Sequence, residues 1–145
     1  MHRWRIAVLR VFGADVDWGA YLYPNVKVWA PWNLSMARHA TLGPGVTVYN
    51  IAKVSLDAKA VVSQQAHLCT GTHDHRDPAF PLYARPIHIG RRAWICASAF
   101  VGPGVTVGDG AVLAACGVAF KELTAWTVYR GNPVMPISQR PPIHD

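Results

Sequence analysis

The strongest constraint on this sequence is a period of six residues in its second half. An aliphatic residue or alanine recurs at Ile89, Ile95, Val101, Val107, Leu113 and Ala119, and a small residue follows most of them. An α-helix repeats every 3.6 residues and a single strand every two, so a strict period of six fits neither. Hexapeptide repeats indicate a parallel β-helix, in which each repeat is one short strand and a turn supplied by glycine. We therefore predict an all-β solenoid.

The same period begins at Val16 and is interrupted three times at the same phase. The interruptions follow Val28, Val48 and Leu68, which are spaced twenty residues apart. If three repeats make one triangular coil, the three insertions project from the same edge of the prism. Long insertions on one edge, ending in a His-bearing loop, favour a functional edge over tolerated irregularities. The insertions are residues 30–33, 49–53 and 70–86.

The length of 145 residues indicates a single domain, residues 1–145, with its own core. We predict an N-terminal cap over residues 1–13, coils over residues 14–120 with the active-site loop at 70–86, and a C-terminal cap and tail over residues 121–145. Within the last part, we expect a helical turn at 121–123, an extended segment at 125–130 and a proline-rich tail from 136. The N-terminal cap reads as a short amphipathic helix. We favour a lid over the first coil for it, since solenoids need capped ends, and contact with anionic lipid headgroups is the alternative.

Composition and charge limit the partners. Hydrophobic residues make up 51% of the chain and charged residues 15%, which predicts surface that is buried against other chains. The net charge of +6 implies anionic partners, but the basic residues are scattered and no nucleic-acid motif is present. A phosphorylated cofactor or an anionic membrane surface is therefore expected in place of DNA. No apolar run is long enough to span a membrane and no signal peptide is evident.

The three cysteines form no CxxC pair. Cys69, Cys96 and Cys116 lie in or beside repeat positions, so we expect small buried thiols, not disulfides or metal ligands. Free thiols fit a reducing cytoplasm. We therefore expect a cytoplasmic protein that also contacts the inner membrane surface.

Several short motifs add a family resemblance to the repeats. They are TGTHD at 70–74, DPAF at 77–80, VGPGVTVG at 101–108 and GNP at 131–133. With these motifs, the chain resembles the left-handed β-helix acyltransferases, and in particular the colanic-acid-type exopolysaccharide O-acetyltransferases, from about Phe12 to Ser138. The resemblance implies a left-handed parallel β-helix, acetyl-CoA as the acyl donor, and a sugar or lipid-linked saccharide as the acceptor. It also implies a homotrimer whose active site is shared between two subunits.

Acyl transfer to a hydroxyl needs a general base, and histidine suits this role because its pKa lies near neutrality. The TGTHD motif places His73 as that base. Asp74 either orients the imidazole or caps a turn, and the sequence does not decide between these roles. His75 and Arg76 are interpreted as contacts to the acceptor or to a phosphate.

The other insertions supply candidate acceptor ligands. Asn33 and Asn50 carry flat amides, which hydrogen-bond well to sugar hydroxyls. Asn50 either binds the acceptor or caps its own bulge, and the first interpretation is favoured. Trp32 either stacks on a sugar face or fills the edge.

The resemblance also implies a coenzyme A groove between adjacent prisms, near the late coils. The matching positions are Trp94, Ala97, Ala115 and Lys121. Lys121 is expected to pair with a phosphate, and the two alanines to offer backbone groups to the pantetheine arm, while Trp94 is almost as well explained by packing. Relatives commonly have threonine in place of Phe120, and some have a phosphate-binding arginine in place of Met135. Arg130, which is itself unusual in its place before the GNP motif, is the candidate cofactor-binding residue that we expect to compensate for this loss.

Two other functions fit parts of the sequence. The same coil carries a carbonic anhydrase with zinc on three histidines between subunits, and His67, His73, His75 and His88 are the candidate ligands here. The motifs favour the transferase, for which no metal is expected. A protein of this fold without activity is the third possibility, and the residues at positions 120 and 135 keep it open.

Overall fold

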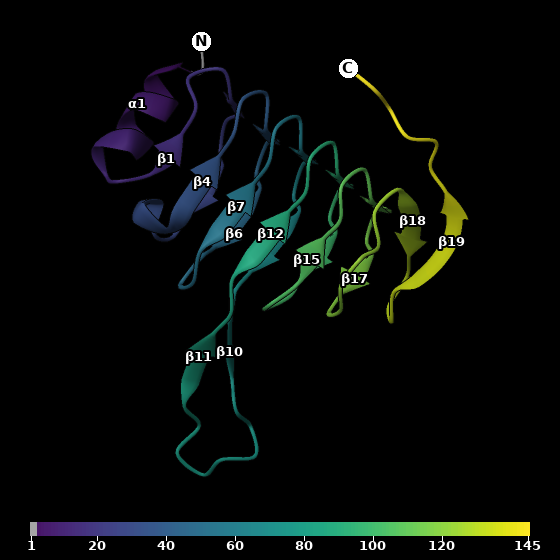
Figure 1. Cartoon of the computed structure of the whole chain (residues 1–145). Coiled ribbons are helices and arrows are strands. Elements are labelled where there is room, and N and C mark those ends of the chain that lie inside the picture. The colour runs from purple at the N-terminus through teal and green to yellow at the C-terminus, as the bar shows by residue number, and fades with distance from the viewer. Residues whose placement is uncertain (1–2) are drawn as a thin grey trace.

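The computed structural model describes residues 3–145 and shows a prism of stacked coils with a helix at one end (Figure 1). Helix α1 (Arg3–Val11) precedes the first coil, as the amphipathic pattern predicts. Its buried residue Ile6 packs into the core at the end of the prism. The first two residues of the predicted cap, Met1 and His2, lie outside the described residues.

Three parallel sheets form the sides of the prism. Sheet 1 contains β1 (Asp15–Val16), β4 (Leu34–Met36), β7 (Val54–Leu56), β12 (Ile87–Ile89) and β15 (Thr106–Val107). Sheet 2 contains β2 (Tyr21–Leu22), β5 (Thr41–Leu42), β8 (Val61–Val62), β13 (Trp94–Ile95), β16 (Val112–Leu113), β18 (Thr127–Arg130) and β19 (Met135–Gln139). Sheet 3 contains β3 (Lys27–Val28), β6 (Thr47–Tyr49), β9 (His67–Cys69), β14 (Phe100–Val101) and β17 (Val118–Ala119). The predicted left-handed parallel β-helix is confirmed.

The strand register matches the phase of the repeats. Val28 pairs with Val48, and Val48 pairs with Leu68, so each of the early coils is twenty residues long. After the long insertion, Ile95 pairs with Leu113, which gives coils of eighteen residues. Apart from Val28, which is partly buried in the first coil, the leading aliphatic residues of the repeats are at most 3% exposed and stack along the prism axis. This continuous apolar column stabilises coils that could not bury their own side chains alone.

Glycine has two roles here, and only one of them is the predicted turn role. Gly104 and Gly110 have positive φ values of 77° and 66° at coil corners. Gly90 and Gly108 follow a leading aliphatic residue, and a Cβ atom there would lie within 2.9 Å of the backbone of the next coil. Their role is close stacking. Many corners instead use other residues with positive φ, including Asn25, His39, Lys59, Gln65, Arg92, Ser98 and Cys116.

The C-terminal part differs from the prediction. The expected helical turn at 121–123 is wrong, because Leu123 is fully buried and forms a β-bridge with Val107 as a further rung of sheet 1. The expected extended segment contains β18. The expected tail is partly wrong as well, because β19 turns back and pairs antiparallel with β18. This strand closes the end of sheet 2 (Figure 1).

The cysteines also differ from one another. All three are free, but only Cys96 is buried, while Cys69 is half-buried and Cys116 is exposed at a corner. Burial raises the pKa of the Cys96 thiol, and it raises that of Cys69 as well. The expectation of three buried thiols is therefore wrong for Cys116, because its turn points outward.

Candidate active site

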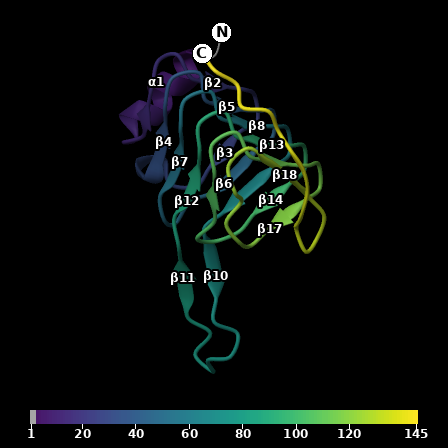
Figure 2. The same ribbon diagram turned by 45° about the vertical axis from the view of Figure 1, so that its right-hand side comes forward.

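All three insertions lie at the corner between sheet 3 and sheet 1, as their phase predicts. The first is the 3-10 helix η1 (Pro31–Asn33), and the second is the bulge at 49–53. The third begins and ends with β10 (Gly71–His73) and β11 (Leu82–Ala84), which pair as an antiparallel hairpin. Figure 2 shows this hairpin projecting away from the prism. We call this corner, with its hairpin, the insertion edge.

Buried polar side chains join the insertions of successive coils. The Asn50 amide accepts a hydrogen bond from the Ala30 N–H at 2.9 Å and donates one to the Ala30 carbonyl at 2.7 Å. One coil further on, the Thr70 hydroxyl donates to the Tyr49 carbonyl at 2.9 Å and accepts from the Ala52 N–H at 3.1 Å. Each bulge would otherwise leave backbone groups without partners, so these side chains replace the missing ladder bonds.

This geometry changes the interpretation of Asn50. Its side chain is completely buried and its amide is bonded on both sides to the backbone of Ala30. A buried amide in this position has no access to a sugar. The structure therefore favours the bulge-capping role, and Asn50 is left out of the acceptor site that we propose below.

Asn33 and Trp32 remain accessible at the insertion edge. The Asn33 amide nitrogen donates to the carbonyls of Ile51 at 2.7 Å and of Asn50 at 3.2 Å. Within residues 3–145, its amide oxygen has no hydrogen-bond donor and remains able to accept one. Trp32 is 67% exposed beside it, so its ring does not fill the edge.

His73 lies at the end of β10, and its imidazole is held by Phe80. The two rings are stacked with centroids 4.1 Å apart and an interplanar angle of 7°. The Phe80 carbonyl oxygen lies 2.9 Å from Nδ1 of His73. Phe80 adopts a φ of 47°, an unfavourable conformation for a bulky side chain, as is often found at functional sites. The sequence shows Phe80 in the DPAF motif but gives no sign of this contact.

The contact with Phe80 decides which nitrogen of His73 can act as a base. A carbonyl oxygen only accepts hydrogen bonds, so Nδ1 must donate its hydrogen to Phe80. In the neutral imidazole, Nε2 then keeps its lone pair. Because His73 is exposed, this nitrogen is available to remove a proton from a bound hydroxyl.

Asp74 caps a turn. Its carboxylate accepts a hydrogen bond from the Arg76 N–H at 3.0 Å, and its backbone carbonyl accepts one from the Asp77 N–H. The orienting group for the imidazole is the Phe80 carbonyl. The two roles that the sequence left open for Asp74 are thus separated, and turn capping is the one that the geometry supports.

An open pocket of about 590 Å³ lies on the hairpin beside His73. His75 and Arg76 line it, as the sequence leads us to expect, and so do Tyr83 and Arg85 from the returning strand, which sequence reasoning missed. The Arg85 guanidinium lies 5.7 Å from the centre of the Tyr83 ring. A hollow with hydrogen-bond donors, a positive charge and an aromatic face can hold a polar, oxygen-rich molecule.

The predicted cofactor residues lie at two different corners. Ala97 and Ala115 occupy consecutive turns between sheets 2 and 3, where the Ala97 carbonyl accepts a hydrogen bond from the Cys116 N–H at 3.0 Å. Arg130 ends β18 at the same corner and is exposed. Lys121 follows β17 at the opposite corner of sheet 3, the one that carries the insertion edge. Lys121 is therefore one side of the prism away from the turns of Ala97 and Ala115.

A shallow pocket of about 250 Å³ lies beside Lys121. It is lined by Val118, Phe120 and Lys121 from the last coil and by residues 132–135 from the turn after β18. Phe120 is 67% exposed and leans towards Phe100, with ring centroids 5.7 Å apart. An apolar surface next to a lysine is suited to a ligand that has an apolar arm and a phosphate group at its end.

Trp94 lies on the outer surface of sheet 2, where its indole N–H donates to the Ser63 hydroxyl at 2.8 Å. Next to it, Lys59, Arg92 and Arg140 line a hollow of about 270 Å³. Lys59 and Arg92 also contact the carboxylate of Asp145. Sequence reasoning missed this basic cluster because its members come from distant segments. Lys59 and Arg92 are separated in the sequence by the same number of residues as the paired residues Val54 of β7 and Ile87 of β12. This equal spacing is the feature of the sequence that could have predicted the basic cluster.

The histidines considered for zinc are not gathered in one place. His88 lies on sheet 1, with Nδ1 2.9 Å from the Ser55 hydroxyl and Nε2 3.0 Å from the Asp57 carboxylate. His67 lies on sheet 3 against Phe100, away from the hairpin that carries His73. Within residues 3–145, no group of three or more His, Cys, Asp or Glu side chains is arranged to hold a metal ion.

Comparisons with known proteins identify the family of the chain. No protein-family model matches the chain. The provisionally named colanic acid biosynthesis acetyltransferase WcaF of Escherichia coli strain K12 is 41% identical over 140 residues, which cover 97% of this chain and 77% of that protein. This chain belongs to the colanic-acid-type acetyltransferases of the hexapeptide-repeat family. Its enzyme class is therefore acyltransferase, as the motifs predict.

Solved structures of the hexapeptide-repeat family share the fold. An acetyltransferase from Vibrio cholerae O1 biovar eltor in complex with acetyl-coenzyme A aligns with a TM-score of 0.87 and 20% identity, covering 98% of this chain and 79% of that one. A maltose O-acetyltransferase from Clostridium difficile 630 aligns with a TM-score of 0.86 and 22% identity, covering 95% and 75% respectively.

Proposed function

We propose that the protein transfers an acetyl group from acetyl-CoA to a hydroxyl of a sugar, in a surface polysaccharide or its lipid-linked precursor. The imidazole of His73, oriented by Phe80 beside an open polar pocket, is the observation that carries this proposal. The similarity to WcaF supports a polysaccharide pathway, and the complex of the Vibrio cholerae protein supports acetyl-CoA as the donor.

The proposed reaction uses His73 as general base. Nε2 removes the proton from the acceptor hydroxyl, and the oxygen attacks the thioester carbonyl. The tetrahedral intermediate collapses with loss of the C–S bond, so the new C–O ester bond replaces it. The departing thiolate of coenzyme A takes up the proton that His73 holds. Asn33, Trp32 and His75 are proposed to contact the acceptor.

We propose that coenzyme A binds along sheet 3 and its two corners. Lys121 would pair with a phosphate and Arg130 with a second one, while the turns of Ala97 and Ala115 border the pantetheine arm, and Trp94 lies further along on sheet 2. Because the two corners lie on either side of sheet 3, we propose that a neighbouring subunit packs beside it and completes the groove. The homotrimer that the family resemblance implies would supply it.

The apolar half of the hairpin supports such an assembly. Phe80, Leu82 and Tyr83 are between 43% and 55% exposed, which is unusual for large apolar side chains grouped in one loop. A second subunit packed against the hairpin would cover them. It would also help to fix His73, since a hairpin of two strands is only marginally stable alone.

Calorimetric titration of acetyl-CoA into the purified protein tests the donor site without knowledge of the acceptor. We expect saturable binding that weakens in Lys121→Ala, with Lys53→Ala as a matched control on the same side of the prism. A panel of sugar acceptors, assayed by release of the coenzyme A thiol, then tests His73→Ala. We expect kcat to fall by about 10²- to 10⁴-fold while acetyl-CoA affinity is retained. A folded protein that binds no acetyl-CoA would refute the proposal.

A further inference from the structure

The helix α1 has an apolar side that the prism does not cover. Ile6 is fully buried and Leu9 is partly buried against the core, so these residues define the inner side of the helix. Trp4, Val8 and Val11 follow the spacing i, i+4 and i+7 and therefore lie together on another side. They are 61%, 47% and 82% exposed.

The exposed stripe continues beyond the helix. Phe12 extends the same spacing to i+8, its N–H bonds to the Val8 carbonyl at 3.2 Å, and its side chain is 62% exposed. Trp32 follows at the neighbouring corner, where its Cβ lies 3.2 Å from the position of a Cβ atom on Gly13. The end of the prism thus presents a row of large apolar side chains.

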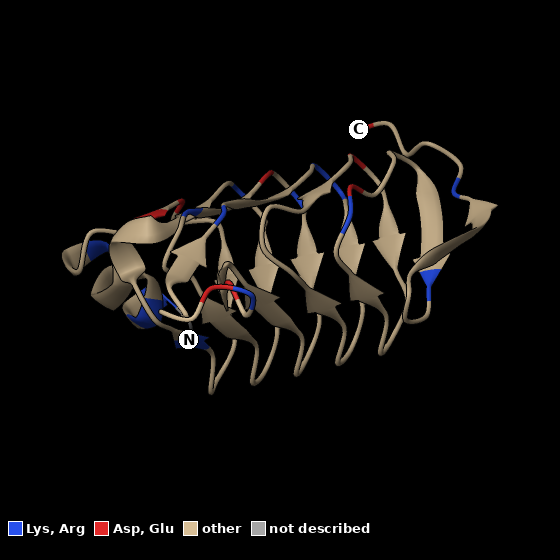
Figure 3. Cartoon of the chain, turned by 90° about the horizontal axis from the view of Figure 1, so that it is seen from below, with Lys and Arg blue, Asp and Glu red and all other residues tan. Residues whose placement is uncertain are grey.

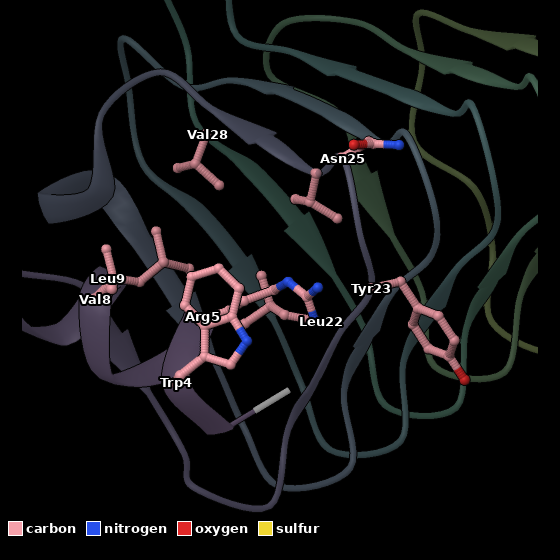
Figure 4. Close-up of a pocket in the computed structure, with 9 residues that line it drawn as sticks. Trp4, Arg5, Val8, Leu9, Leu22, Tyr23, Asn25 and Val28 are labelled. Carbon is pink, nitrogen blue, oxygen red and sulfur yellow. The ribbon is translucent and has the colours of Figure 1, made fainter. Parts of the chain in front are cut away.

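A hollow of about 340 Å³ lies between α1 and the first coil. Trp4 and Val8 line it from the helix and Val28 lines it from the coil (Figure 4). Val26 is a further lining residue from the coil. The helix is therefore an incomplete lid, because it leaves part of the apolar end of the prism uncovered.

Arginines flank the stripe on both sides. Successive helix positions are about 100° apart, which places Arg3 and Arg10 on one flank of the stripe and Arg5 on the other. Arg5 lies 4.8 Å from the centre of the Trp4 ring, and Arg10 lies 5.2 Å from that of Trp18. Helix α1 contains no acidic residue, and Figure 3 shows its basic positions gathered at this end of the prism. The nearest acidic residues in the sequence, Asp15 and Asp17, are exposed on the first coil, and the Asp17 carboxylate accepts a hydrogen bond from the Gly19 N–H.

We propose that this end of the prism docks on the surface of an anionic lipid bilayer. Apolar side chains with arginines on both flanks suit the boundary between headgroups and acyl chains, where aromatic rings insert and guanidinium groups reach the phosphates. The charge selects this partner, because a second copy of the same surface would bring six or more arginines together. No helix in residues 3–145 is long and apolar enough to cross a membrane.

The position of the docking surface has a consequence that rests on the proposed function. The hairpin leaves the prism at the third coil, so the active site lies two coil spacings, or roughly 10 Å, above the first coil. A saccharide carried by a lipid in the same bilayer would project into this zone. Docking would therefore hold the insertion edge at the height of a lipid-linked acceptor.

Flotation of the purified protein with lipid vesicles tests the proposal without any assay of activity. We expect binding to phosphatidylcholine vesicles with about 30% phosphatidylglycerol, weak binding to pure phosphatidylcholine, and loss of much of the binding at about 0.5 M salt. Replacing Arg3 and Arg5 with Gln should weaken binding to anionic vesicles about fivefold for each residue.

The apolar contribution is tested by Trp4→Ser with Val8→Ser. Both side chains are exposed, so the variant should melt like the wild type but bind anionic vesicles at least about tenfold more weakly. Ile137→Ser with Ile143→Ser is the matched control, since these exposed residues lie in the C-terminal segment, and it should float like the wild type.

Two outcomes would overturn the proposal. One is that wild-type protein stays with the unbound fraction at low salt in the presence of anionic vesicles. The other is that the Trp4 and Val8 variant floats normally but sediments with a smaller mass, which would show that the stripe contacts another copy of the chain. Because every measurement is of lipid binding or mass, failure here leaves the acetyl-CoA titration as an independent test of the proposed function.

Discussion

Replacing Asn50 with Ala should destabilise the protein without removing an acceptor contact. The Asn50 amide makes two hydrogen bonds to Ala30, at 2.9 Å and 2.7 Å, and is completely buried. Each such bond contributes about 1 kcal/mol, and leaving the buried N–H of Ala30 without a partner adds a further desolvation cost, while the Ala30 carbonyl keeps the hydrogen bond from the Asn33 N–H. We expect the free energy of unfolding to fall by about 3 kcal/mol. This is a large share of the roughly 5–15 kcal/mol typical of a folded domain.

Urea unfolding at one fixed protomer concentration measures this change, because assembly would otherwise shift the apparent stability. Gln64→Ala is the control. It also removes a side-chain amide, but an exposed one, so its effect should stay within about 0.5 kcal/mol. Below its melting temperature, the Asn50 variant should keep the acceptor KM of the wild type. An unchanged unfolding free energy together with a raised acceptor KM would refute the capping role and restore Asn50 to the acceptor site.

Three further results follow from contacts of single side chains. Phe80→Ala should lower kcat about tenfold while acetyl-CoA affinity stays the same. The substitution removes the ring that stacks on His73 but keeps the backbone carbonyl. An equal loss of acetyl-CoA affinity would show a wider disruption of the structure. Burial lowers the pKa of His67, so the unfolded chain takes up this proton before the folded one as the pH falls. Stability should therefore decrease from about pH 7.5 to pH 5.5, and melting curves of His67→Phe should show a smaller decrease. Thiol labelling should modify the exposed Cys116 well before Cys96, because Cys96 is buried and its pKa is raised. Mass spectrometry of the labelled peptides measures the order, and earlier labelling of Cys96 would contradict the prediction.

The coil architecture could be predicted because it is a local and repeated property. Each set of six residues makes the same strand and turn, so a period in the sequence becomes a period in space. The two extra residues that interrupt the repeat after Val28 and after Val48 likewise predicted where the insertion edge lies. Strand pairing then followed the count of residues, and the register of Val48 with Leu68 agrees with it.

The details of the site could not be predicted in this way, because they depend on contacts that do not repeat. The orientation of His73 depends on a turn in which Phe80 takes a positive φ, and no pattern in the sequence marks that conformation. The role of Asn50 depends on whether its amide points inward to Ala30 or outward to solvent, and the sequence does not show this direction. At the C-terminal end the repeat stops, so nothing indicated that β19 would pair antiparallel with β18.

The hairpin and the two separated cofactor corners lead to the same physical requirement. A pair of short strands with exposed Leu82 and Tyr83 does not bury enough apolar surface to fix a catalytic side chain by itself. Lys121, in turn, lies across sheet 3 from the turns of Ala97 and Ala115. A second prism packed along the insertion edge would cover the exposed side chains of the hairpin. It would also bring its own turns of Ala97 and Ala115 towards Lys121 of the first chain. On the proposed function, the single chain would therefore hold the parts of one active site without completing it, and assembly would both order His73 and close the coenzyme A groove.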